Sequence, residues 1–178
     1  VIVLNLATRL EGIAILLTLY LVRHGQTDWN VEGRLQGHAD RPLNETGRAQ
    51  AAAVAQRLAT VHLDAIYASD LQRAMSTAQA IAAYHDVRVS PEPRLREFSY
   101  GEWEGRRMSD LAHLYPEAMQ AWHEDPPAYV PRGADSPDKV RERICDLLEE
   151  LRTHPANGAV LLVSHGRTLR TLFSLIEP

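Results

Sequence analysis

The chain has 178 residues, 45% of which are hydrophobic, and it carries a formal net charge of −4. This length is typical of one domain and the apolar fraction is enough to cover a sheet on both faces, so we expect a single domain over residues 1–178. The negative charge argues against nucleic acid and against an anionic membrane as partners, because both attract a basic surface.

The N-terminal segment, residues 1–16, is an atypical leader that begins at Val1. The apolar run from Ile13 to Val22 is too short to span a membrane, and the stretch before it contains Glu11 and no convincing cleavage site. We therefore interpret the run as a core strand and not as an export signal. The only cysteine, Cys145, cannot form an internal disulfide, which favours a reducing, cytoplasmic location.

Three short apolar runs have the length and flanks of buried parallel strands. They cover Leu17–Val22, Leu63–Ala68 and Ala159–Ser164. Between the first two, apolar residues recur at helical spacing from near Asn44 or Thr46 to Leu58. A second helix follows the second strand, where Ser69 and Gln72 form a capping-box pattern that predicts its start.

Two more helices are predicted toward the C-terminus. Ser136 followed by Pro137 is a typical helix opening, and the apolar stripe behind it continues to Leu151. We interpret this stripe as core packing. The segment from Arg167 to Ile176 has the same periodicity and should pack on the sheet directly after the last strand.

The stretch 91–133 differs from the rest because it holds most of the prolines and two of the three tryptophans. We expect it to be an insertion within the domain that folds over the sheet as a lid, with a helical part from Met108 to Trp122. Strands that alternate with helices predict an α/β fold. The expected architecture is a three-layer α/β/α arrangement with a mostly parallel open sheet and a partly helical lid.

Residues suited to catalysis follow each predicted strand. Arg23-His24-Gly25 follows the first strand, Ser69 to Arg73 follows the second, and His165-Gly166 follows the third. The carboxyl ends of parallel strands meet at one edge of a sheet, so these side chains should converge. Of the eight histidines, only these two combine a preceding strand with a following glycine, which lets the backbone approach a ligand closely.

This set of residues fits phosphoryl transfer, which needs a nucleophile, positive groups around the phosphate oxygens and an acid for the leaving oxygen. The neutral imidazole of His24 can attack phosphorus without a metal. The groups that we assign to the phosphate oxygens are Arg23, Arg73, a protonated His165 and the amide of Asn30. We assign the role of acid to Glu97, which lies between Arg96 and Phe98.

The motifs resemble those of the histidine phosphatase superfamily, the phosphoglycerate mutase-like family. Its N-terminal signature, arginine helix, acid loop and second histidine are similar to residues 21–30, 69–78, 95–105 and 163–166, respectively. These motifs follow one another in the family's order between Leu17 and Ile176. The short loop Gly101–Gly105 is similar to that of the phosphatase branch, which includes alpha-ribazole phosphatases and broad-specificity phosphatases.

The resemblance implies that His24 becomes phosphorylated and that Glu97 first protonates the leaving group and then activates water. The residues expected to hold the phosphate or to line the substrate site are Arg23, Thr27, Asn30, Arg73, His165 and Gly166. The resemblance also implies a small-molecule phosphate monoester as the substrate and a reaction without a metal or other cofactor.

The chain departs from the family pattern at its end. It stops at Pro178, shortly after the second histidine, whereas family members usually continue through a further helix and strand. One edge of the sheet would then be vacant, and the strand-like segment Val1 to Leu4 is a candidate to occupy it. An exposed edge would also favour pairing of two chains into a homodimer.

Two other functions remain open. One is a phosphoglycerate mutase, which returns the phosphate to a second hydroxyl group instead of to water, and the other is a catalytically silent phosphate-binding module. The sequence lacks the ligand spacing of a zinc or di-metal hydrolase. A nucleotide P-loop is excluded, because Lys139 is the only lysine and follows no glycine-rich loop.

The lid should select the alcohol part of the substrate. Its candidate apolar contacts are Tyr100, Trp103, Met108 and Trp122, and its candidate contacts for a second anionic group are Arg106, Arg107 and Arg132. For each of these residues, ordinary packing or solvated charge is the alternative explanation.

Overall fold

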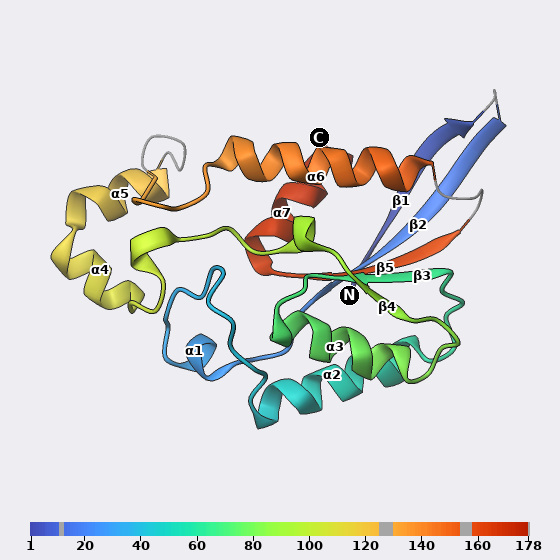
Figure 1. The fold of residues 1–178 in the computed structure, drawn as a ribbon, viewed down its shortest axis with the longest axis horizontal. Helices are drawn as coiled ribbons and strands as arrows, with labels where there is room; N and C mark the ends of the chain where they lie inside the picture. The colour runs from blue at the N-terminus through green and yellow to red at the C-terminus, as the bar shows by residue number, and fades with distance from the viewer. Residues whose placement is uncertain (11–12, 125–129, 154–157, 178) are drawn as a thin grey trace.

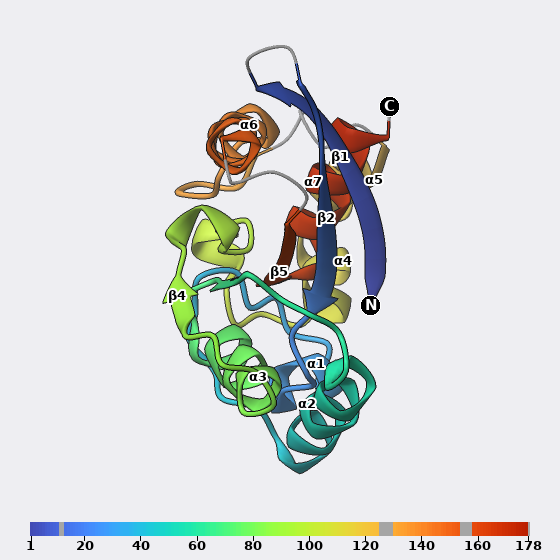
Figure 2. The ribbon, with the colours of Figure 1, turned by 90° about the vertical axis from the view of Figure 1, so that its right-hand side faces the viewer.

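The computed structural model describes residues 1–10, 13–124, 130–153 and 158–177. Its sheet has the strand order β1-β2-β5-β3-β4. The strands are β1 (Ile2–Leu10), β2 (Ile13–Arg23), β3 (Ala65–Ala68), β4 (Val89–Pro91) and β5 (Ala159–Ser164). All neighbours pair in parallel except β1, which lies antiparallel to β2 along the edge of the sheet (Figure 2). The three predicted strands are confirmed, and β1 and β4 are additional.

The central strand β5 explains why helices cover both faces. Val160 and Leu162 point into one hydrophobic cluster, whereas Leu161 and Val163 point into another. A strand that is apolar on both faces is stable only if both faces are covered. Figure 1 shows α2 (Glu45–Leu58) and α3 (Gln72–Ala82) below the sheet, and α6 (Pro137–Arg152) and α7 (Gly166–Ile176) above it. The predicted three-layer α/β/α architecture is confirmed.

Two of the predicted helix starts are confirmed by their capping hydrogen bonds. The side chain of Asn44 accepts from the amide of Gly47 at the start of α2. Ser136 accepts from the amide of Lys139 at the start of α6, with Pro137 as the first helical residue. Local sequence is sufficient here, because each cap interacts only within its own first turn.

The predicted capping box of α3 is wrong. The helix begins two residues later than a Ser69 cap requires, and its N-cap residue, Leu71, makes no side-chain cap hydrogen bond. The amide of Gln72 donates instead to the carboxylate of Asp40 at 2.8 Å. The hydroxyl of Ser69 lies 2.8 Å from Nε2 of His165, so a long-range contact replaces the local cap.

The N-terminal leader is part of the sheet. The β1–β2 register runs from Ile2 opposite Leu21 to Leu10 opposite Ile13. Leu4 and Leu6 are buried in the same cluster as the apolar faces of α6 and α7. The hypothesis that the leader pairs along this edge of the sheet is confirmed.

The stretch 91–133 contains the 3-10 turns η1 (Pro93–Leu95) and η2 (Gly101–Trp103), followed by α4 (Met108–Leu114) and α5 (Pro116–Glu124). The helical part is therefore confirmed, although it breaks before Pro116, where the residue before a proline avoids the helical conformation. Trp103 and Leu111 are buried in the same cluster as α6. This stretch therefore contributes to the core, and it also extends beyond the sheet through α4 and α5 (Figure 1).

Elsewhere, α1 (Asp28–Val31) is a single turn after β2. Among the residues described, no helix combines the length and the apolar character that crossing a membrane requires.

The buried face of β1 provides a test of this fold. Leu6 is 4% exposed, whereas Val3 on the same strand is 52% exposed. We expect Leu6→Ala to lower the free energy of unfolding by about 2–4 kcal/mol, because it leaves a cavity in the core. Val3→Ala, the matched control, should change it by less than about 0.5 kcal/mol. Urea denaturation measures both values, and equal effects would show that β1 does not pack on the core.

Candidate active site

The register of the sheet brings the ends of β2, β5 and β3 together. Arg23 lies opposite Ser164, and the amide of His24 donates to the carbonyl of Ser164 at 3.0 Å. The amide of Ser69 donates to the carbonyl of Val163 at 2.9 Å. The rings of His24 and His165 consequently meet, with centroids 5.0 Å apart. The two histidines converge as the sequence predicts.

His24 is held as a neutral imidazole with one nitrogen available. Its Nδ1 donates to the carbonyl of Gly25 at 2.7 Å, which places the proton on Nδ1 and leaves the lone pair on Nε2. Burial, followed by the charges of Arg73 and Arg23, lowers the pKa of His24 to about 3. The ring is therefore neutral at physiological pH, the form in which an imidazole is nucleophilic.

The backbone behind His24 is fixed by two glycines that pack against each other. A Cβ on Gly25 would lie 2.4 Å from the carbonyl oxygen of Gly47, and one on Gly47 would lie 2.0 Å from that of Gln26. The amide of Gly25 donates to the hydroxyl of Thr77 at 3.1 Å. The turn that carries His24 therefore rests directly on the first turn of α2 and on α3.

Arg73 supplies a buried positive charge beside the two histidines. Its Nε donates to Nδ1 of His165 at 3.2 Å, and its terminal nitrogens donate to carbonyl oxygens of Gly37 and Ala39 at 2.8 and 2.9 Å. All these acceptors are uncharged, and Arg73 forms no ion pair within the part of the chain described. Burial lowers the pKa of Arg73, but a guanidinium remains charged in proteins. The site therefore favours a bound anion.

His165 is neutral, so its predicted role as a protonated donor to phosphate is wrong for this arrangement. Its Nδ1 accepts from Arg73, which leaves the proton on Nε2, and this nitrogen donates to the hydroxyl of Ser69 at 2.8 Å. Burial and the charge of Arg73 hold the pKa of His165 well below its usual range. Because both nitrogens have protein partners, His165 orients Arg73 and contacts the ring of His24.

Arg23 and Gly166 form the open side of the site. The side chain of Arg23 is exposed, and its guanidinium forms no hydrogen bond or ion pair with a described residue. Gly166 is the first residue of α7, and the nearest atoms to a Cβ placed on it would be the Arg23 guanidinium carbon and Nε, both at 3.8 Å. The donors of Arg23 are therefore available to an anion above the start of α7.

Asn30 lines the site, and Thr27 positions it from behind. Oδ1 of Asn30 accepts from the amide and the hydroxyl of Thr27 at 3.0 and 3.1 Å, which turns its amide nitrogen toward the cavity. Thr27 is fully buried as the N-cap of α1, and it does not line the cavity. The expected contact of Thr27 with the substrate is therefore replaced by a supporting role.

Glu97 lies at the N-terminus of α7. One carboxylate oxygen accepts from the amide and the hydroxyl of Thr168 and from the amide of Phe98, each at 3.1 Å. The other oxygen accepts from the amide of Arg167 at 3.2 Å. These contacts hold the carboxylate in one position at the start of α7.

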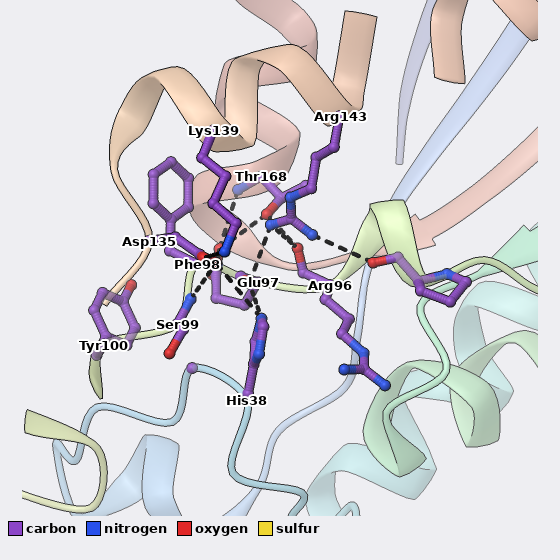
Figure 3. A network of polar contacts seen from close by, with 12 residues as sticks. His38, Arg96, Glu97, Phe98, Ser99, Tyr100, Asp135, Lys139, Arg143 and Thr168 are labelled. Atoms are coloured by element: carbon purple, nitrogen blue, oxygen red, sulfur yellow. Dashed lines mark hydrogen bonds and ion pairs between the residues drawn. The ribbon is translucent and has the colours of Figure 1, made fainter. Parts of the chain in front are cut away.

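The backbone of Glu97 is fixed as well (Figure 3). Its carbonyl oxygen accepts from Nε2 of His38 at 2.9 Å and from a terminal nitrogen of Arg143 at 3.2 Å. The carboxylate of Asp135 accepts from the amide of Ser99 at 2.9 Å. Arg143 is on α6, and Asp135 lies two residues before the first residue of this helix. The helix therefore anchors the loop that carries Glu97.

All these groups surround a cavity of about 240 Å³. Of the residues predicted for catalysis and for the phosphate, all except Thr27 line it. Sequence reasoning missed Gln36 and three further arginines in its lining, which are Arg34, Arg167 and Arg170. The signals available for them were the position of Gln36, six residues after Asn30, and the positions of Arg167 and Arg170, one and four residues after Gly166.

Arg167 is held over two aromatic rings. Its guanidinium carbon lies 4.3 Å from the ring centroid of Phe98 and 5.7 Å from that of Tyr100. Burial raises the pKa of Tyr100 to about 12, so this side chain remains a neutral phenol at the cavity wall. The aromatic residues of the acid loop therefore position one of the cavity's cations.

The expected lid contacts are largely wrong. Tyr100 does line the cavity, but Trp103 is 2% exposed and belongs to the core, and Met108 packs against that core. The side chain of Trp122 lies outside the described residues. Of the candidate arginines, Arg107 is the N-cap residue of α4, and none of the three lines the cavity. Burial explains the difference, because the large apolar side chains of this stretch complete the core.

Within the described ranges, no three His, Cys, Asp or Glu side chains gather in a way that could hold a metal ion.

Comparisons with known proteins agree with this geometry. The family model described as histidine phosphatase superfamily (branch 1) matches residues 19–177. Phosphoserine phosphatase 1 from Hydrogenobacter thermophilus is 38% identical over 87% of this chain and 74% of that protein. The probable phosphoglycerate mutase GpmB from Cronobacter sakazakii is 39% identical over 90% of this chain and 75% of that protein. The structure of mycobacterial glucosyl-3-phosphoglycerate phosphatase complexed with VO3 has a TM-score of 0.81 and 36% identity, over 87% of this chain and 78% of that chain.

The neutral state of His24 can be tested by ¹⁵N NMR. We expect its ring to stay neutral, with the proton on Nδ1, from pH 8 down to about pH 4, because its pKa is lowered to about 3. In the urea-unfolded chain the same ring should titrate near about pH 6.5. The unfolded chain then binds more protons as the pH falls below that value, so His24 should destabilise the fold in acid. Titration of folded His24 between about pH 6 and 7 would contradict this assignment.

Proposed function

The chain belongs to the histidine phosphatase superfamily, branch 1, and from this premise we propose that it hydrolyses a small-molecule phosphate monoester through a phosphohistidine at His24. One observation carries the proposal: the free Nε2 of a neutral His24 lies in a cavity beside the buried cation of Arg73. The names of two relatives, both phosphatases of small phosphorylated molecules, support the same reaction class.

In the first step, the phosphate oxygens bind to the guanidinium groups of Arg23 and Arg73 and to the amide of Asn30. Nε2 of His24 attacks phosphorus, and the bond from phosphorus to the ester oxygen breaks. The departing oxygen takes a proton from the carboxyl group of Glu97 and leaves as an alcohol. The positive groups stabilise the charge that develops on the transferred phosphoryl group.

In the second step, water attacks the phosphohistidine and Glu97 accepts a proton from it. This releases inorganic phosphate and restores the neutral ring of His24. In this scheme Glu97 gives its proton to the departing oxygen in the first step and regains one from water in the second.

We propose that no metal takes part, because Arg23 and Arg73 can supply the positive charge that a metal would bring to the phosphate. Phosphate release from an aryl phosphate should be the same with and without a chelator. Pairing of two chains along the exposed edge of β1 also remains a proposal, which the molar mass in solution would test.

A mutase is the second candidate, because one relative is named a probable phosphoglycerate mutase. A mutase would return the phosphoryl group to another hydroxyl group instead of to water. Incubation with 3-phosphoglycerate and a trace of the 2,3-bisphosphate separates the two reactions. We expect free phosphate, whereas rapid isomer formation without free phosphate would show a mutase.

The nucleophile can be tested by substitution. We expect His24→Ala to lower phosphatase activity by about a thousandfold or more and to abolish labelling of the protein by a ³²P-phosphate ester in rapid-quench experiments. His62→Ala is the matched control, because the side chain of His62 is 86% exposed and does not line the cavity. An unlabelled wild-type protein, or a fully active His24→Ala variant, would overturn the proposed function.

The acid can be tested through the leaving group. Glu97→Gln cannot donate a proton, so we expect kcat to fall by about 10²–10⁴-fold for an alkyl phosphate. For nitrophenyl phosphate, whose leaving group needs no proton, the first step should slow by less than about tenfold. Glu102→Gln on the same loop is the control, because Glu102 does not line the cavity. Equal slowing of the first step for both esters would rule out Glu97 as the acid.

A further inference from the structure

The cavity of about 240 Å³ around His24 and Arg73, in which the phosphate is proposed to bind, is called the phosphate cavity below. A second hollow of about 390 Å³ adjoins it. It is lined by Ile2 at the start of β1, by Leu169 and Phe173 on α7, and by Arg23, Gly166 and Arg170. The last three residues also line the phosphate cavity, so the two hollows share a wall. Leu4 and Leu6 of β1 and Leu172 of α7 belong to one hydrophobic cluster, so the two elements that line the second hollow also share a core.

The shared wall is low at Gly166, because this residue has no side chain. The atoms nearest to a Cβ at this position belong to the Arg23 side chain, at 3.8 Å. That side chain is exposed and without a partner among the described residues, so it can move with a ligand. A phosphate bound to Arg23 and Arg73 can therefore extend its ester substituent across Gly166 into the second hollow.

The side chains of Ile2, Leu169 and Phe173 make the second hollow largely apolar. Ile2 and Phe173 are 49% and 40% exposed, unusually high values for large hydrophobic side chains that face a concave surface. Covering them gains free energy in proportion to the apolar area removed from water. A dry apolar cavity of about 150 Å³ is sufficient for benzene, so this hollow has room for one or two rings or a comparable alkyl chain.

A polar hollow of about 250 Å³ that also borders His24 is the competing site for the same substituent. It is lined by Gln26, Asn30 and Gln50 together with Arg23 and His24. Two of its amide oxygens are already occupied: that of Gln50 accepts from the amide of Gln26 at 2.9 Å, and that of Gln26 accepts from Asn44 at 3.1 Å. A ligand hydroxyl group that displaced water there would find few new hydrogen-bond partners, so its binding would gain little free energy.

We propose that the hollow formed by Ile2, Leu169 and Phe173 binds the alcohol part of the substrate, and that this part is an aryl or alkyl group. The inference rests on the proposed phosphatase function and adds the substrate class to it. Residues of β1 and α7 would then select the alcohol part of the substrate, whereas the sequence predicted that the stretch 91–133 selects it. Arg170, at the shared wall, would face the substituent near its point of attachment.

The test compares ethyl phosphate, 2-phenylethyl phosphate and glycerol 1-phosphate. All three have an alkoxide leaving group, so differences in kcat/KM report the fit of the substituent and not leaving-group chemistry. We expect kcat/KM for 2-phenylethyl phosphate to exceed that for the other two esters by about tenfold or more, because part of the ring is removed from water.

Two variants locate this preference. Phe173→Ser and Ile2→Ser should each lower the ratio of kcat/KM for 2-phenylethyl phosphate to that for ethyl phosphate toward unity. They should leave kcat/KM for ethyl phosphate within about twofold. Both side chains are partly exposed, and they belong to different elements, so if one variant loses the fold the other still tests the inference. Tyr84→Ser is the control: its side chain is also exposed, at 51%, but it lines neither hollow.

Three results would overturn the inference. Equal hydrolysis of ethyl and 2-phenylethyl phosphate would show that the apolar hollow is not used. A preference for glycerol 1-phosphate that Gln50→Ala removes would assign the alcohol part to the polar hollow. Failure to release phosphate from any ester, together with no labelling of His24, would overturn the phosphatase function itself, and the inference with it.

Discussion

The buried guanidinium of Arg73 is the interaction on which the arrangement of the site depends. It reaches from α3 to the ring of His165 after β5 and to two carbonyl groups of the loop 37–39. It therefore ties three separate segments of the chain around one positive charge. The same charge, together with burial, keeps both histidines neutral, because a cation nearby disfavours a second one. A site built in this way is electrostatically incomplete until an anion binds.

The first turn of α7 performs several tasks at one place. Its free amide groups hold the carboxylate of Glu97, and Gly166 leaves space above the helix start for a ligand. Helix N-termini suit both tasks because their amide groups lack partners within the helix. The acid and the anion thus compete for the same positive end.

The surroundings of Glu97 are rigid, whereas those of Arg23 are open. The backbone of Glu97 receives hydrogen bonds from His38 and from Arg143 on α6 (Figure 3). Arg23 is exposed, and three hollows of different polarity meet at its side chain. The packed side of the site therefore holds Glu97 in one position, whereas the open side leaves space for a ligand beside Arg23.

The sequence alone determined the strands that end next to His24, Ser69 and His165, the main helices, and eight of the 14 residues that line the cavity. These features depend on local periodicity and on the rule that parallel strands end at one edge, so neighbouring residues are sufficient to predict them. The tertiary structure decided the capping of α3, the protonation of His165, the burial of Trp103 and the participation of Arg167 and Arg170. Ser69 and His165 are 96 residues apart, yet their hydrogen bond removes a predicted helix cap and fixes the proton on an imidazole. Such contacts depend on which distant segments share a face, and no local pattern records that.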